Sequence, residues 1–141
     1  MSLERGFAVI KVGTDICSVK RIAEAYKRFG RRLLERVLTP TEIEYVASHP
    51  GHLPGRLAVR FAAKEAASKA LGTGWRGIGW KEIEIVKARS GAPSLRLHGR
   101  AASLAERQGL THWEVSLSHE RDYATAFVLA HDDGRRSEGG N

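Results

Sequence analysis

The chain has 141 residues, of which 42% are hydrophobic and 28% charged, and a formal net charge of +7. These values suit one folded domain and exclude a globally disordered chain. The single cysteine, Cys17, excludes an intramolecular disulfide, and no apolar run reaches the ~20 residues that a membrane span needs. We therefore expect a soluble, cytoplasmic protein whose basic surface attracts something anionic: nucleic acid, acidic lipid, an acidic protein or a phosphorylated small molecule.

The first predicted element is a strand over 7–16, FAVIKVGTDI. Apolar residues on both of its sides indicate a strand that is covered on both faces near its start. Gly13 marks a bend or a close approach of two backbones. Asp15 is expected just past the end of this strand.

A helix over about 18–29 should follow, because its apolar residues recur at helical spacing. Ser18 is the expected N-cap and Gly30 the expected stop. The remaining faces of the helix and the residues after it are strongly basic: Lys20, Arg21, Lys27, Arg28, Arg31, Arg32 and Arg36. Taken alone, this pattern is also compatible with an ordinary solvated helix.

The motif TPTE at 39–42 predicts the start of another helix. Its threonine can cap the helix, its proline suits the first turn, and its glutamate can complete a capping box. We expect this helix to run to about Ser48. The segment 49–55, rich in proline and glycine, is then expected to be a loop.

The stretch RFAAKEAASKALGTG at 60–74 lies in a helix expected over about 56–71. Five small residues share one arc in helical projection: Ala62, Ala63, Ala66, Ala67 and Ala70. They form the predicted packing face, since small side chains let a neighbouring element approach closely. The other side carries one carboxylate among cations: Arg60, Lys64, Glu65 and Lys69. An exposed Glu–Lys pair worth about 0.3–0.5 kcal/mol is the simplest explanation.

A metal-and-phosphate site is the alternative explanation for this mixture of charges. Lysine and arginine neutralise phosphate oxygens, and Mg²⁺ is typically held by one or two carboxylates together with phosphates and waters. The helix also ends in Gly-Thr-Gly, at 72–74. A second carboxylate is needed beside Glu65, and Asp15 is the best candidate.

Strands dominate the second half of the chain. We expect strands at 80–88 and 94–99, a short helix at 100–109, and two further strands at 113–119 and 123–131. Residues 1–131 would form a single domain, followed by a disordered tail at 132–141. With one strand and three helices before this half, the order indicates an α+β fold with an antiparallel sheet packed with helices.

Three segments together resemble the signature blocks of the holo-acyl-carrier-protein synthases, the short, single-domain type of 4′-phosphopantetheinyl transferase. They are VGTDICSVKRI at 12–22, RFAAKEAASKALGTG at 60–74 and VSLSHERDYATAFVL at 115–129. The family commonly has Gly-x-Gly-x-Asp in the first block, and here Lys11 replaces the first glycine. Gly13 and Asp15 of that pattern are kept.

The resemblance implies transfer of the 4′-phosphopantetheine arm of coenzyme A (CoA) to a serine of an apo acyl carrier protein, releasing adenosine 3′,5′-bisphosphate. It also implies Mg²⁺ as cofactor and a homotrimer with active sites between subunits. Asp15 and Glu65 would be the metal ligands, and Lys69 would contact the diphosphate. Glu65, directly or through a metal-bound water, could take the serine proton.

The resemblance further implies two sets of contacts. The expected CoA contacts are Arg60, Lys64, Lys69, Gly72, Thr73, Gly74 and His119. The expected carrier-protein contacts are Lys20, Arg21, Lys27, Arg28 and Arg31, because acyl carrier proteins present an acidic helix beside the modified serine.

A small basic nucleic-acid-binding domain is the competing interpretation from another class. The net charge permits it, and Trp75, Arg76 and Trp80 could supply stacking and phosphate contacts. Against it, the sequence has no known nucleic-acid motif, and Asp15 and Glu65 would repel a phosphate backbone.

Overall fold

The structure is a computed structural model that describes residues 9–134. Its strands form two antiparallel sheets, a three-stranded one in the order β1-β5-β4 and a two-stranded one of β2 and β3. The strands are β1 Ile10–Ser18, β2 Ile83–Lys87, β3 Pro93–Leu97, β4 His112–His119 and β5 Tyr123–His131. The helices are α1 Val19–Phe29, α2 Arg31–Val37, α3 Pro40–Ala47, α4 Leu53–Leu71 and α5 Gly99–Arg107, with short 3₁₀ turns η2 Pro50–His52 and η3 Trp80–Glu82. The expected α+β class with antiparallel sheets is confirmed.

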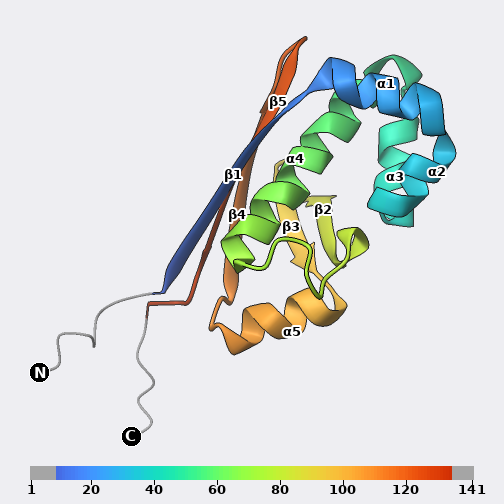
Figure 1. Cartoon of the computed structure of the whole chain (residues 1–141). Coiled ribbons are helices and arrows are strands. Elements are labelled where there is room, and N and C mark those ends of the chain that lie inside the picture. The colour runs from blue at the N-terminus through green and yellow to red at the C-terminus, as the bar shows by residue number, and fades with distance from the viewer. Residues whose placement is uncertain (1–8, 135–141) are drawn as a thin grey trace, which may run out of the picture.

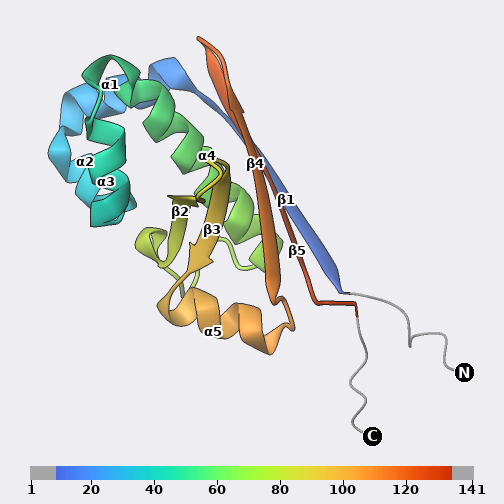
Figure 2. The ribbon, with the colours of Figure 1, turned by 180° about the vertical axis from the view of Figure 1, so that it is seen from behind.

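Helix α4 is the centre of the molecule, and it lies along the inner face of the three-stranded sheet (Figure 1). The five alanines of its predicted packing face are all buried, as expected. Seen from behind, the helices again lie on one side of the sheet (Figure 2). Among the described residues, no helix is both long and apolar enough to cross a membrane.

Gly13 is where β1 comes closest to α4. A Cβ atom added there would lie 1.8 Å from the carbonyl oxygen of Ala66 and 3.0 Å from the amide nitrogen of Ala70. Only a residue without a side chain fits between the two backbones, so the expected close approach is confirmed. This contact fixes the distance between β1 and α4 near the candidate site.

Two expectations about the first strand need correction. Strand β1 pairs with β5 as far as Ser18, so Asp15 lies within the strand, opposite Ala126, and not past its end. The side facing away from α4 is also uncovered, with Val12 and Ile16 54% and 61% exposed. The reason is that α4 covers only the inner face of the sheet. Residues 7 and 8 of the predicted strand lie outside the described residues.

Helix α2 was not predicted, so four α-helices, rather than three, precede β2. Gly30 ends α1 with a φ of 62°, and the chain restarts as a helix at the next residue. The many arginines of this segment obscure an apolar pair three residues apart, Leu34 and Val37, which are both buried.

The predicted starts of α1 and α3 are confirmed by hydrogen bonds. Ser18 Oγ accepts from the amide of Arg21 at 3.1 Å. Thr39 and Glu42 form the reciprocal capping box of α3. The expected loop at 49–55 is wrong, because η2 occupies 50–52 and α4 begins at Leu53, with Pro54 in its first turn. Residues 80–82 form η3 before β2 begins at Ile83.

The expected tail at 132–141 is only partly described. Asp132 forms two hydrogen bonds with Val9: its carboxylate accepts from the Val9 amide, and its own amide donates to the Val9 carbonyl. Residues 135–141 lie outside the described residues.

Candidate active site

An ion pair joins β1 to α4 at the position that the sequence singled out. Lys69 Nζ donates to Asp15 Oδ1 at 3.1 Å and to the carbonyl oxygen of Thr14 at 3.0 Å. The Lys69 side chain is 53% exposed and that of Asp15 19%. A ligand can therefore reach both groups from solvent.

Glu65 lies on the same side of α4, one turn before Lys69, and is partly exposed. The partly buried thiol of Cys17, two residues after Asp15, lies within the electrostatic influence of both carboxylates. Burial, then the charge of Asp15, then that of Glu65 raise the pKa of Cys17 to about 11. Asp15 pairs with Lys69, and Glu65 lies one helical turn before Lys69, so both carboxylates lie on the side of α4 that faces β1.

This donor set fits Mg²⁺. The ion prefers hard oxygen ligands and commonly takes only one or two protein carboxylates, leaving the other positions to phosphates and waters. Within residues 9–134, no group of three or more His, Cys, Asp or Glu side chains gathers to hold a metal. A pair of carboxylates beside an ammonium therefore suits a metal shared with a phosphate better than a closed all-protein cage.

A second group of cations lines a cavity of about 500 Å³ on another side of α4. Its polar lining consists of Tyr45, His52, Arg56, Arg60, Lys87 and His119. The guanidinium groups of Arg56 and Arg60 lie 4.2 and 4.6 Å from the centre of the Tyr45 ring. Arg60 Nε is buried and has no hydrogen-bond partner among the described residues, so this side chain retains a free donor.

Helix α4 contacts the end of β4 at Gly55, where the helix lies against the His119 ring. A Cβ atom on Gly55 would lie 3.2 Å from His119 Cδ2. The predicted residues Arg60 and His119 are therefore brought to one cavity. The sequence interpretation missed Arg56 and Tyr45, although Arg56 lies one helical turn before Arg60 and could have been found by that spacing.

The expected CoA contact of Lys64 is wrong for this structure. The Lys64 side chain is 0% exposed. Its ammonium donates to Glu42 Oε1 at 2.8 Å and to the carbonyl oxygens of Trp80 and Ile83. All three of its protons are used inside the protein, so Lys64 cannot touch a ligand at the surface.

The predicted Gly-Thr-Gly turn directly follows the Lys69 turn of α4. Gly72 and Gly74 have φ values of 85° and 59°, a conformation that side chains disfavour. The amide of Gly72 donates to the Lys69 and Ser68 carbonyls. The turn thus ends α4 sharply, three to five residues after the ion-paired lysine.

The tryptophans of the nucleic-acid interpretation are engaged elsewhere. Trp75 and Trp80 stack on each other with ring centroids 3.9 Å apart, and Trp80 also stacks on Phe61 at 4.8 Å. Their rings are partly buried in this stack, so they do not form a free platform for bases.

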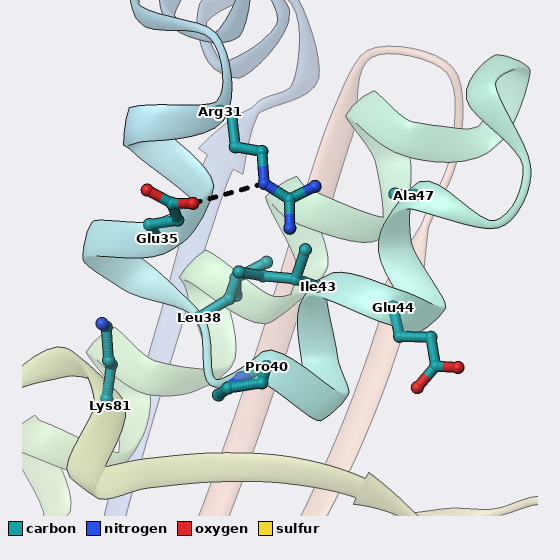
Figure 3. A pocket seen from close by; sticks show the side chains of 8 residues that line it. All are labelled: Arg31, Glu35, Leu38, Pro40, Ile43, Glu44, Ala47 and Lys81. Atoms are coloured by element: carbon teal, nitrogen blue, oxygen red, sulfur yellow. Dashed lines mark hydrogen bonds and ion pairs between the residues drawn. The ribbon is translucent and has the colours of Figure 1, made fainter.

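The five expected carrier contacts on α1 and α2 are all exposed. One of them, Arg31, is paired with Glu35 at 3.3 Å beside a separate cavity of about 400 Å³ between α2 and α3 (Figure 3). That cavity contains none of the expected metal or CoA residues. The candidate site therefore has two parts: the cavity lined by Arg56, Arg60 and His119, called the cation cavity below, and the Asp15–Glu65–Lys69 group.

Comparison with known proteins identifies the family. The sequence matches the model of the 4′-phosphopantetheinyl transferase superfamily over residues 11–128. The chain belongs to this superfamily. The family that the sequence resembled is thereby confirmed, and a phosphopantetheinyl transferase is favoured over a nucleic-acid-binding domain.

Relatives of this transferase cover most of its length. A holo-[acyl-carrier-protein] synthase of Gloeobacter violaceus is 48% identical over 118 residues, which are 84% of this chain and 89% of the relative. The crystal structure of the Neisseria meningitidis synthase has a TM-score of 0.77 and 42% identity, covering 85% of this chain and 96% of that one. The Helicobacter pylori synthase in complex with coenzyme A has a TM-score of 0.74 and 32% identity, covering 84% and 98%.

Proposed function

We propose that this phosphopantetheinyl transferase moves the 4′-phosphopantetheine group of CoA to a serine of an apo acyl carrier protein, releasing adenosine 3′,5′-bisphosphate, with Mg²⁺ as cofactor. The observation that carries the proposal is the solvent-accessible Asp15–Lys69 ion pair between β1 and α4, with the Glu65 carboxylate one helical turn before Lys69. The complex of the Helicobacter pylori relative with CoA supports CoA as the donor.

The chemistry matches these residues. The serine attacks the β-phosphate, and negative charge shifts to the phosphate that leaves. The Lys69 ammonium, held by Asp15 at 3.1 Å, is placed to stabilise this charge. Mg²⁺ held by Asp15 and Glu65 would supply further charge neutralisation when bound. Glu65 is an available carboxylate to accept the serine proton. Cys17 stays a protonated thiol, so it is not a competing nucleophile.

The two parts of the candidate site point away from each other within one chain. Arg60 and Lys69 are nine residues apart, which at about 100° per residue places them on opposite sides of α4. Arg60 extends towards Tyr45 of α3, whereas Lys69 extends towards β1. We therefore propose that the cation cavity of one copy and the carboxylates of another complete each site in a homotrimer, with CoA between them.

The uncovered face of the sheet supports self-association. Its exposed apolar side chains are Ile10, Val12, Ile16, Tyr123 and Phe127. Exposed apolar side chains gathered on one sheet face are typical of a protein interface. Covering this face with other copies of the chain would also bury both sides of β1, as the sequence pattern indicates.

Carrier docking on the basic surface of α1 leads to a kinetic prediction. Replacing Arg21 and Arg28 together (Arg21→Glu, Arg28→Glu) should raise the KM for the carrier about tenfold or more, since such charges act mainly on encounter. The KM for CoA should stay nearly unchanged. Steady-state kinetics with each substrate varied separately measures both. A control variant, Arg89→Glu with Arg107→Glu, makes the same charge change at exposed residues elsewhere. If the α1 variant raised the KM for CoA as much as the KM for the carrier, docking on α1 would be contradicted.

Mass spectrometry of the carrier tests the proposed function. The protein is incubated with CoA, Mg²⁺ and an apo acyl carrier protein. The expected result is a carrier heavier by one phosphopantetheine group, and none when a chelator removes the metal. A carrier of unchanged mass in the presence of Mg²⁺ would refute the proposal.

A further inference from the structure

A buried ion pair, Lys64 with Glu42, ties α4 to three other elements. Both side chains are 0% exposed, and they meet at 2.8 Å. Lys64 also donates to the carbonyls of Trp80 in η3 and Ile83 at the start of β2. Glu42 accepts from the amide of Thr39 at 2.8 Å and from that of Ile85 at 2.8 Å. The pair thus joins α4 to α3, η3 and β2 through all three Lys64 protons and both Glu42 carboxylate oxygens.

Stability alone is a weak explanation for such a pair. Removing two charges from water is costly, and well-packed apolar side chains of similar size are often as stable or more so. Burial accordingly lowers the pKa of Lys64, against the opposing effect of Glu42. In some proteins, buried polar groups of this kind instead specify one arrangement of the elements that they join.

The stretch of α4 nearest the candidate site is buried mainly through alanines. Over 62–70 the buried apolar side chains of α4 are five alanines, which fix the rotation of this stretch about the helix axis less firmly than longer side chains would. The larger buried apolar residues of α4 lie nearer its ends: Leu53, Leu57, Val59 and Leu71. Lys64 is a long, fully buried side chain in the same stretch, and Glu65 is the next residue. A rotation of α4 at Lys64 would therefore move Glu65, and Lys69 one turn later, relative to Asp15.

We infer that Lys64 and Glu42 are positioning residues, which set the rotation of α4 so that Glu65 and Lys69 face Asp15 of β1. The inference rests on the proposed function, because it gives the pair a role in metal binding and transfer rather than in folding alone. It assigns to Lys64 no contact with substrate.

The test uses a neutral double variant, Glu42→Gln with Lys64→Met, which leaves no unpaired buried charge. Binding of Mn²⁺, used in place of Mg²⁺, is titrated by electron paramagnetic resonance in the presence of CoA, and the Mg²⁺ dependence of transfer is measured in parallel. We expect the metal concentration for half-saturation to rise about tenfold to a hundredfold, as for other residues that orient metal ligands. The control is Leu110→Ala, which opens the core between α5 and β4 and should lower the unfolding temperature without changing metal affinity.

The outcomes separate this inference from the proposed function. If the double variant binds Mn²⁺ as tightly as the wild type and loses only thermal stability, the pair is structural and the inference is wrong. If the wild type binds Mn²⁺ but does not modify a carrier, the proposed function fails while the comparison of metal affinities still decides the inference. Glu42→Asp, which keeps both charges and shortens the arm holding Lys64, serves if the double variant does not fold. Weaker Mn²⁺ binding by Glu42→Asp supports positioning, and unchanged binding overturns it.

Discussion

Replacing Glu65 by glutamine is expected to abolish carrier modification, with a fall in kcat/KM on the order of a thousandfold or more. Glutamine keeps the size of the side chain but removes its negative charge and its basicity. Both proposed roles of Glu65, metal ligand and proton acceptor, are lost together. Asp15 would remain paired with Lys69 at 3.1 Å, so the variant isolates the contribution of the second carboxylate.

Folding should be little affected by this change, because Glu65 is partly exposed and surface substitutions usually alter stability by less than about 0.5 kcal/mol. Transfer is followed by mass spectrometry and unfolding by circular dichroism. Glu106→Gln, on the exposed side of α5, makes the same chemical change away from the site. If Glu65→Gln turned over the carrier at nearly the wild-type rate, neither proposed role of Glu65, metal ligand or proton acceptor, would stand.

The second large effect is expected from Gly13→Ala. The added methyl group would lie 1.8 Å from the carbonyl oxygen of Ala66, a backbone atom that cannot rotate away. Either β1 or α4 must shift, and we expect a loss of about 3 kcal/mol or more in the free energy of unfolding, at the upper end for overpacked cores. Asp15 lies two residues further along β1, so metal-dependent activity should fall as well.

Urea denaturation compares Gly13→Ala with a matched glycine. Gly51 lies in the exposed η2 turn, where an added Cβ meets nothing within 4 Å. Gly51→Ala should therefore change the free energy of unfolding by less than about 0.5 kcal/mol. If Gly13→Ala proves as stable as Gly51→Ala, the close approach of β1 and α4 is not a constraint on the fold.

Local signals in the sequence predicted much of this fold. The capping box of α3 and the N-cap of α1 involve residues three apart in the chain, so the sequence alone contains both partners. The alanine face of α4 follows from helical periodicity in the same way. Helix α2 was missed because its three apolar residues, Leu33, Leu34 and Val37, lie among arginines and a glutamate, and only packing against neighbouring elements shows which face is buried.

The candidate site shows where sequence reasoning ends. Lys64 and Lys69 are lysines of one helix, and both follow the family motif. The structure separates them because Glu42 of α3 draws one into the interior and Asp15 of β1 holds the other at the surface. These partners lie 22 and 54 residues away in the chain, so no local pattern distinguishes the two lysines.

Mixing two inactive variants tests most directly whether the cation cavity and the carboxylates of a working site come from different copies of the chain. One variant is Glu65→Gln; the other, Arg60→Met with His119→Ala, removes two cavity groups. The two are unfolded and refolded together in equal amounts, and carrier modification is measured. If each site combines two copies, random mixing should restore about a quarter of the wild-type rate. Activity no higher than that of the separate variants would contradict a site built between subunits.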